Sequence, residues 1–461
     1  MEKTTKVKTA LSAGIVVLCV MFTALAASGE TYVQGTDGLI VDFGGGMTYF
    51  GTFNPEDNPD AIEGLELTCA VFGFDLLLNG DEVVWIDSSV SGKDGKTWSL
   101  YVVEKPSSEL QQTYPWVKVS VDPGEVKVKE YAAAAWAYCS EDETPSRAVD
   151  ATGVSFYGYG HPERVVSLAP SCTEMICSVG GERKIVGTDD YSNYPESVES
   201  SRLSGNIASI GGFSNPSYES IVKMNPDLVV CVNSQRSHLD MAERLRSAGI
   251  NVVVADGGED VSSIMESIMM VGTAMGTREA AKNTVDGIVG DLSDIVDIIE
   301  GNSSAPKNAV IALSTDKSPW VSGSYTYASD VLRIISVGNS FSELGGWVMV
   351  TSESLVTEDV DCIVVITSNG PGSQSEYKAM MDELGDEWKH TDAYSNGKVY
   401  FLTDSAADLA SRAGPRVAQF AELMARIIQD TAFEGDMPKY VGDDYRDYIS
   451  LARDPAAEGA S

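Results

Sequence analysis

Residues 31–140 show short runs of alternating apolar and polar residues, separated by glycine, asparagine and aspartate. Alternation with a period of two is typical of strands that bury one face. The pattern predicts strands at Leu39–Val41, Leu65–Phe74, Thr97–Val103 and Trp116–Val121. We therefore expect a small β-rich domain, followed at 141–160 by a polar linker.

From residue 161 onward, strand-like apolar runs alternate with helical patterns. Ser171 and Glu174 have the spacing of a capping box that opens a helix after the first run. Helices are also expected at Leu239–Ala248 and from Arg416 to Thr431. The predicted strands are Arg164–Leu168, Lys184–Val186, Asp227–Val232, Asn251–Ala255, Ala309–Leu313, Cys362–Thr367 and Val399–Leu402. Strands and helices in alternation indicate parallel α/β sheets.

One long helix is predicted in the middle of this region. Its apolar residues recur at spacings of three and four: Ala281, Val285, Ile288, Leu292, Ile295 and Ile299. Such spacing places one apolar stripe along about six helical turns. The predicted fold class is therefore α/β, with two pseudo-symmetric lobes joined by one long helix and preceded by the β-rich domain. The expected boundaries are 161–276 for lobe 1, 277–303 for the helix, 304–433 for lobe 2 and 434–461 for a polar tail.

A repeated motif supports two equivalent lobes. Gly-Gly-Phe213, five residues and Glu219-Ser-Ile-Val precede one strand, and Gly-Gly-Trp347, five residues and Glu353-Ser-Leu-Val precede another. Because open α/β sheets bind ligands beyond the carboxyl ends of their strands, we expect Phe213 and Trp347 to face each other across a cleft. The alternative is that each ring only fills the base of its own lobe. Glu219 and Glu353 are either first-turn acids of helices or a matched pair that docks on a dimeric partner.

Composition and motifs exclude several functions. The chain has 68 Asp+Glu against 32 Lys+Arg, a net charge of −36, which argues against nucleic acid as a partner. The sequence holds no GxSxG, Walker or HExxH motif, and its three histidines do not favour a histidine-built metal site. Asp189-Asp190 beside Tyr191 is the remaining enzyme-like pattern, but neighbouring residues in a strand point apart. We expect a protein without catalytic residues, metal or intrinsic cofactor.

The N-terminus has the features of a secretory signal, because three lysines precede an apolar run at 10–27. The run is also long enough for an uncleaved anchor, so residues 1–29 are interpreted as a signal peptide or an N-terminal anchor. The protein is then extracytoplasmic, in the periplasm or at the cell surface. Cys69 and Cys139 are candidates for a disulfide in such an oxidising compartment.

Several motifs resemble the cobalamin-binding proteins of ABC importers, in the helical-backbone class of substrate-binding proteins. The matching segments are Arg164–Glu174, Tyr191–Pro195, Asn225–Val229, Pro319–Gly323, Gly346-Trp347 and Arg412–Arg416. The resemblance covers about residues 161–430. It implies a monomer that carries a corrinoid, such as cobalamin, to the permease dimer of an ABC importer at the membrane.

The resemblance also assigns residues. Tyr191, Phe213, Trp320 and Trp347 match rings of the ligand cleft, and Arg412 lies near a position with polar cleft groups. Glu219 and Glu353 match two glutamates that meet permease arginines. The segments 232–235 and 404–409 lack the aromatics expected of the family. Haem or ferric-siderophore binding therefore stays open as an alternative, as does an anchored surface interaction protein without a transport role.

The β-rich domain resembles the C-terminal domain of transcobalamin through Gly95–Tyr101 and Ala135–Tyr138. This resemblance implies an accessory corrinoid binder or a lid. A plain spacer is the alternative.

Overall fold

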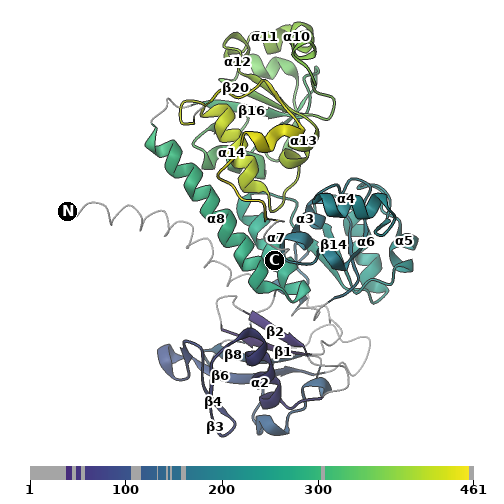
Figure 1. Ribbon diagram of the computed structural model, residues 1–461, viewed down its shortest axis with the longest axis vertical. Coiled ribbons are helices and arrows are strands. Elements are labelled where there is room, and N and C mark those ends of the chain that lie inside the picture. Colours follow the sequence, from purple (N-terminus) through teal and green to yellow (C-terminus); the bar gives the residue numbers. More distant parts are fainter. Residues whose placement is uncertain are drawn as a thin grey trace, which may run out of the picture.

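The computed structural model describes residues 38–43, 48–52, 58–104, 116–131, 133–141, 144–145, 148–156, 162–302, 307–433 and 435–455. The expected signal or anchor at 1–29 lies outside these residues. Figure 1 shows the β-rich domain at the bottom, lobe 1 to the right and lobe 2 at the top. The long helix α8 (Arg278–Gly301) runs diagonally from the lower part of the molecule to lobe 2.

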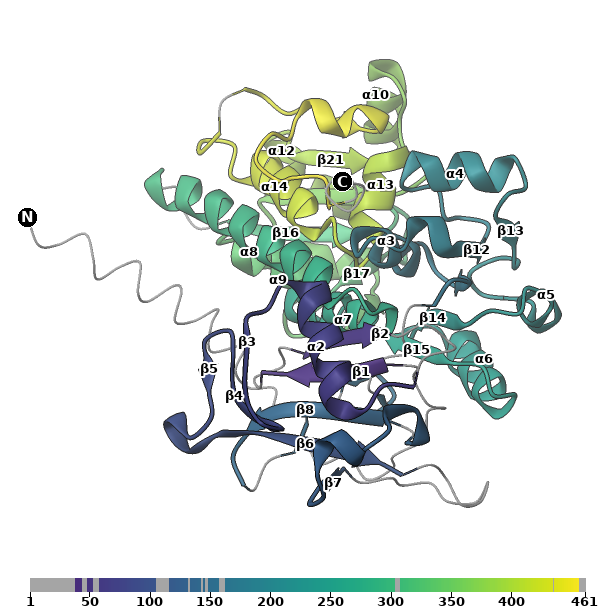
Figure 2. The same cartoon turned by 60° about the horizontal axis from the view of Figure 1, so that its bottom comes forward.

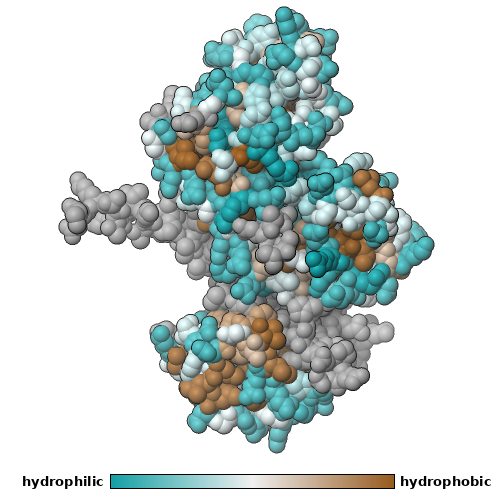
Figure 3. Space-filling model, viewed as in Figure 1, coloured by the Kyte–Doolittle hydropathy of each residue, from teal (hydrophilic) through white to brown (hydrophobic). Residues whose placement is uncertain are grey.

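The β-rich domain is built on a five-stranded sheet in the order β2-β1-β8-β6-β7. Its strands are β1 (Gly38–Asp42), β2 (Thr48–Thr52), β6 (Thr97–Val103), β7 (Val117–Lys118) and β8 (Ala133–Cys139). A smaller antiparallel sheet contains β3 (Leu76–Asn79), β4 (Glu82–Ile86) and β5 (Ser89–Val90). Among the described strand pairs of the larger sheet, β1 and β8 are parallel and the others are antiparallel. Figure 3 shows apolar side chains gathered on the visible face of this domain, whereas the lobes present a mainly polar surface.

The strand predicted at Leu65–Phe74 is wrong, because these residues lie mainly in helix α2 (Ala61–Phe72). Asp60 caps the helix and forms a capping box with Glu63, and Gly73 ends it in the left-handed conformation at φ 72°. The helix lies across β1 and β2 (Figure 2). Asp60 and Glu63 were visible in the sequence as a helix start, but the dense apolar run after them masked the helical period.

The candidate pair Cys69 and Cys139 does not form a disulfide. Both thiols are buried, and the Cys139 sulfur lies 3.2 Å from the Tyr101 hydroxyl. Burial, followed by the charges of Asp87 and Glu66, raises the pKa of the Cys69 thiol to about 12. The domain therefore holds both cysteines as thiols in its interior.

Lobe 1 is a five-stranded parallel sheet in the order β13-β12-β11-β14-β15. The strands are β11 (Val165–Ser167), β12 (Ile185–Thr188), β13 (Ala208–Ser209), β14 (Leu228–Val232) and β15 (Val252–Ala255). The helices are α3 (Pro170–Ser178), α4 (Glu196–Leu203), α5 (Tyr218–Lys223) and α6 (Arg236–Ser247). Both faces of β14 are buried, which explains its uninterrupted apolar sequence.

Part of the expected linker belongs to lobe 1. The hairpin of β9 (Ala148–Val149) and β10 (Ser155–Phe156) places Phe156 in the core, where it is 1% exposed. Asp150 between these strands has a buried carboxylate that forms an ion pair with the partly buried Arg246 of α6. The described residues 148–156 are thus attached firmly to lobe 1.

Lobe 2 contains a mixed sheet in the order β19-β17-β16-β20-β21-β22, with β18 paired to β16. The strands are β16 (Asn308–Ala312), β17 (Trp320–Ser322), β18 (Gly338–Asn339), β19 (Trp347–Met349), β20 (Cys362–Ile366), β21 (Val399–Leu402) and β22 (Tyr440–Val441). The helices are α9 (Tyr327–Ile334), η5 (Ser352–Val356), α10 (Gln374–Glu383), α11 (Asp386–Lys389), α12 (Asp392–Ser395), α13 (Asp404–Ser411) and α14 (Val417–Ile428). Two strands of this sheet, β17 and β19, run antiparallel to their neighbours, which lobe 1 does not match.

The segment expected to form a polar tail packs against the lobes as far as residue 455. Its strand β22 extends the lobe 2 sheet, and η6 (Asp443–Asp447) holds Tyr445 at 0% exposure. Arg453 then donates to Asp291 of α8 at 2.9 Å. The sequence did not predict this packing, because the apolar residues of the segment stand singly among many acids and show no helical or strand period.

The two lobes share one core. A single cluster of buried residues includes Val230 of β14, Ile295 of α8, Leu332 of α9 and Phe420 of α14. Helix α7 (Val261–Met275) contacts both α8 and α9. The predicted α/β class with two lobes is confirmed. A continuous apolar joint of this kind resists hinge motion, because opening it would expose the shared core to water.

Candidate functional site

Loops that follow the strands of lobe 1 meet at one edge of its sheet, because all five strands are parallel. Tyr191 follows β12 and Phe213 follows β13 at this edge. Crevices beyond the carboxyl ends of strands are the usual ligand sites of open α/β sheets.

The Tyr191 loop is held by buried polar groups. One Asp189 oxygen accepts the Tyr191 backbone N–H at 2.8 Å, and the other accepts the Ser192 hydroxyl at 2.6 Å. Burial raises the pKa of Asp189, although these hydrogen bonds oppose the shift. Ser192 also lies 2.8 Å from the Thr173 hydroxyl of α3. A fixed backbone therefore presents the Tyr191 ring, which is 62% exposed.

Phe213 is half-buried, and its ring meets the His238 ring edge-on with 4.9 Å between centroids. The Phe213 carbonyl lies 2.8 Å from Nε2 of His238. Burial lowers the pKa of His238, so this ring is neutral at pH 7 and donates Nε2–H to the carbonyl. The inner side of Phe213 also packs against the shared core of the lobes.

The two tryptophans of lobe 2 that were predicted to line the ligand cleft lie on neighbouring strands. Trp320 begins β17, is 47% exposed and pairs with Met349, which is 59% exposed. Trp347 begins β19 opposite Ser322 and is half-buried against the shared core. Phe213 and Trp347 thus rest on the same core from different lobes. That their rings face each other across a cleft stays a prediction.

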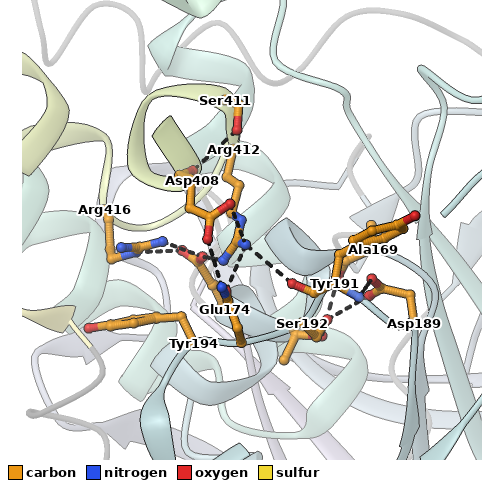
Figure 4. Close-up of polar contacts among 12 residues, drawn as sticks. Ala169, Glu174, Asp189, Tyr191, Ser192, Tyr194, Asp408, Ser411, Arg412 and Arg416 are labelled. Atoms are coloured by element: carbon orange, nitrogen blue, oxygen red, sulfur yellow. Dashed lines mark hydrogen bonds and ion pairs between the residues drawn. The ribbon is translucent and has the colours of Figure 1, made fainter. Parts of the chain in front are cut away.

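An ion network joins the lobes beside Tyr191 (Figure 4). Glu174 of α3 accepts from Arg412 at 3.0 Å and from two nitrogens of Arg416 at 2.8 and 2.6 Å. Arg412 also pairs with Asp408 at 3.0 Å. Burial alone raises the pKa of Glu174, but Arg416 and Arg412 outweigh it, so the pKa lies below its usual value. Glu174 is therefore a buried carboxylate anion at neutral pH.

Arg412 connects this network to the Tyr191 loop. Its Nη2 donates to the Tyr191 carbonyl at 3.2 Å and to Oδ1 of Asn193 at 2.7 Å. The Tyr191 ring points away from the guanidinium (Figure 4). The Arg412 side chain is only 7% exposed and its nitrogens hold protein partners, so it is buried at the lobe junction. Its expected contact with the ligand stays a prediction.

The capping box predicted at Ser171 and Glu174 is wrong. Glu174 instead forms the ion pairs with Arg412 and Arg416 at the lobe junction. Ala169 is the residue that precedes α3, and it makes no side-chain cap. Sequence reasoning missed the pairing of Glu174 with Arg416 because the two residues lie far apart in the chain. The available signal was one acid inside the apolar run Cys172–Ile176, which needs a buried cation as partner.

The predicted docking glutamates occupy similar places in the two lobes. Glu219 lies in the first turn of α5, is 81% exposed and lies 3.8 Å from Arg244. The Arg244 guanidinium stacks on the Tyr218 ring at 3.6 Å. Glu353 lies in the first turn of η5, is exposed, and has its pKa lowered by a hydrogen bond from Thr351. Both carboxylates are accessible to a partner.

Neither a metal-binding cluster nor a membrane-spanning helix occurs in the residues that the structure describes. These residues hold no group of three or more His, Cys, Asp or Glu side chains arranged for a metal ion. No helix in the described ranges combines the length and the apolar character needed to cross a membrane.

Two α/β lobes on one long helix, with the half-buried rings of Phe213 and Trp347 on their shared core, define a two-lobed substrate-binding protein. The chain belongs to the Periplasmic binding protein family, whose sequence model matches residues 165–406, more than half of its length. Members of this family are solute-binding proteins rather than enzymes, and those of ABC importers deliver small molecules to a permease. The family match begins after the β-rich domain.

Individual relatives agree with this assignment. The uncharacterised ABC transporter substrate-binding lipoprotein YvrC of Bacillus subtilis is 30% identical over 275 residues, 59% of this chain and 82% of that protein. A cobalamin-binding protein of Halobacterium salinarum is 23% identical over 291 residues, 62% of this chain and 75% of that protein. A periplasmic heme-binding protein of Pseudomonas aeruginosa shares the fold with a TM-score of 0.52 at 20% identity, over 60% of this chain and 96% of that one.

Proposed function

We propose that this protein binds a corrinoid, such as cobalamin, between its lobes and delivers it to an ABC importer from outside the cytoplasm. The observation that carries the proposal is the set of aromatic residues from both lobes: Phe213 and Trp347 rest on the core that the lobes share, and Tyr191 and Trp320 are exposed. The similarity to the cobalamin-binding protein of Halobacterium salinarum supports a corrinoid over other flat ligands.

A wide macrocycle with polar substituents suits such a site. Aromatic rings provide large flat contact areas, and each well-packed ring adds about 0.5–1.5 kcal/mol beyond simple burial. Tyr191, Trp320 and the accessible sides of Phe213 and Trp347 are the proposed contacts. Arg412 contributes indirectly, because its Nη2 lies 3.2 Å from the Tyr191 carbonyl and holds the backbone that presents the Tyr191 ring.

The lobe junction favours a cleft that exists before the ligand binds. The shared core and the buried Glu174 ion pairs both resist separation of the lobes. A preformed site loses little conformational entropy on binding, which favours affinity without a large closing motion. The β-rich domain contacts α8 through β2, and this placement supports the spacer role over the lid.

Delivery would use Glu219 and Glu353. Because they occupy similar places in two lobes, they can meet the two related subunits of a permease dimer. Arg244 beside Glu219 keeps that carboxylate near the surface of α6 until a permease arginine competes for it. Exposed ion pairs of this kind are weak, about 0–1 kcal/mol, so a permease arginine can replace Arg244 at little energetic cost.

The test is calorimetric titration of the purified protein with cyanocobalamin, haemin and a ferric siderophore. We expect one bound cyanocobalamin per chain, with tryptophan quenching, and weaker or no binding of the other two. Preferred binding of haemin or the siderophore would replace the corrinoid assignment within the same class. Failure to bind all three would favour an anchored interaction protein.

A further inference from the structure

Tyr325 has a backbone conformation that its side chain disfavours. Five described non-glycine residues have positive φ: Asp87, Asn225, Tyr325, Ser336 and Asp404. Every side chain is strained in this region, but a short polar one is tolerated better than a bulky aromatic one. Tyr325 has φ 59° and is 76% exposed, so burial of its ring does not offset the strain.

Hydrogen bonds on both sides of Tyr325 hold this conformation. Ser324 donates its N–H to the Leu344 carbonyl at 2.7 Å and accepts from Gly346 N–H at 2.6 Å. Thr326 caps α9 by accepting the Ser329 N–H at 3.1 Å. The backbone is therefore fixed before and after Tyr325, and its ring is presented to solvent.

Tyr325 lies next to the lobe junction. Tyr327, two residues later, donates its N–H at 2.9 Å to Gly258, which follows β15 in lobe 1. A Cβ at Gly258 would lie 2.4 Å from the Cβ of Ala413, the neighbour of Arg412. Arg412 in turn holds the Tyr191 carbonyl. A continuous set of contacts thus connects the region of Tyr325 to the Tyr191 loop.

The other side of Tyr325 borders the loop that leads to Trp347. A Cβ at Gly345, two residues before Trp347, would lie 3.7 Å from Cδ2 of Tyr325. Tyr325 therefore lies between the Trp347 loop and the junction that positions Tyr191. Strained residues concentrate at ligand-binding sites, where the surrounding structure holds them in the conformation that presents the side chain.

We infer that Tyr325 is a further ligand-contacting residue of lobe 2, and that its ring packs on the flat face of the macrocycle. This inference rests on the proposed function and adds a residue that the sequence did not single out. An aromatic side chain at this strained position lowers the stability of the free protein and raises affinity for the ligand.

The experiment compares Tyr325→Gly, Tyr325→Phe and the control Ser336→Gly by cyanocobalamin titration and thermal unfolding. Ser336 has the same φ of 59° and is exposed, but it lies at the far end of α9. Glycine relieves strain at both positions, so neither glycine variant should have a lower Tm, and an increase of about 2 °C is expected. Tyr325→Gly should weaken binding about tenfold, and Tyr325→Phe should stay within about twofold because the ring remains.

Retention of wild-type affinity by Tyr325→Gly would overturn the inference and leave the proposed function intact. An equal loss in Ser336→Gly would also overturn it, because the effect would then come from lobe 2 as a whole. If the wild-type protein binds no cyanocobalamin, haemin or siderophore, the proposed function and this inference both fail.

Discussion

Replacing Glu174 with glutamine removes the carboxylate that Arg412 and Arg416 share at the lobe junction. Glu174 and Arg416 have side chains that are 2% and 4% exposed, so two guanidinium groups would remain buried with less compensating charge. Breaking a buried ion pair by removing one partner costs about 3–5 kcal/mol. We expect Glu174→Gln to lower the free energy of unfolding by about that amount at pH 7.

Urea unfolding followed by tryptophan fluorescence measures this difference. Asp286→Asn is a matched control, since it removes an exposed ion pair with Lys282 on α8. Such a helical pair contributes about 0.3–0.5 kcal/mol, so the control should unfold almost like the wild-type protein. A loss below about 1 kcal/mol in Glu174→Gln would refute the electrostatic account of the junction.

The pH dependence provides a second test of the same variant. Because the pKa of Glu174 is lowered in the folded state, its carboxylate stabilises the fold above the pKa of an unfolded glutamate, about 4.3. This contribution is lost as the pH falls through the lower folded pKa. The stability difference between wild type and Glu174→Gln should therefore shrink in acid. A difference that is constant from pH 7 down to pH 3 would contradict the assigned charge.

Further variants test other parts of the account. Changing both Glu219 and Glu353 to lysine should abolish uptake by whole cells and leave ligand affinity unchanged. The control Glu343→Lys, at an exposed acid of lobe 2, should leave both uptake and affinity unchanged. Normal uptake by the double variant would remove the docking role. Alkylation of the Cys69 thiol at pH 8 should require denaturation, because the residue is buried and its pKa is about 12. Rapid labelling of the native protein would contradict its placement. Arg453→Ala should lower stability by about 1–3 kcal/mol through loss of its charged hydrogen bonds to α8, as measured by urea unfolding, and an unchanged midpoint would show that the C-terminal segment is not anchored there.

The long helix was predictable because its apolar spacing reflects a single physical requirement, one buried stripe. The prediction of 277–303 differs from α8 by one or two residues at each end. Helix α2 was missed because Leu65–Phe74 is apolar on more than one face, which hides the period of 3.6. The lobe junction was missed because the pairing of Glu174 with Arg416 depends on tertiary contacts that no local pattern encodes.

The candidate site was predictable in part. The duplicated Gly-Gly-aromatic motif identified Phe213 and Trp347, and the structure places both against the core that the lobes share. The strained conformation of Tyr325 has no sequence signal, since φ 59° at a tyrosine depends on the hydrogen bonds that Ser324 makes with the Leu344 carbonyl and the Gly346 N–H, outside its local sequence. The sequence likewise did not show that Arg412 is buried whereas Tyr191 is exposed.

The central claim is that aromatic residues of both lobes hold a corrinoid, and the most direct measurement is the cyanocobalamin Kd of Trp320→Ala and Trp347→Ala. Trp85→Ala in β4 of the β-rich domain is the matched control for loss of a partly buried tryptophan. We predict that the two lobe 2 variants weaken binding by one to several kcal/mol, about tenfold or more, while the control binds like the wild-type protein. Unchanged affinity in both lobe 2 variants would contradict the claim.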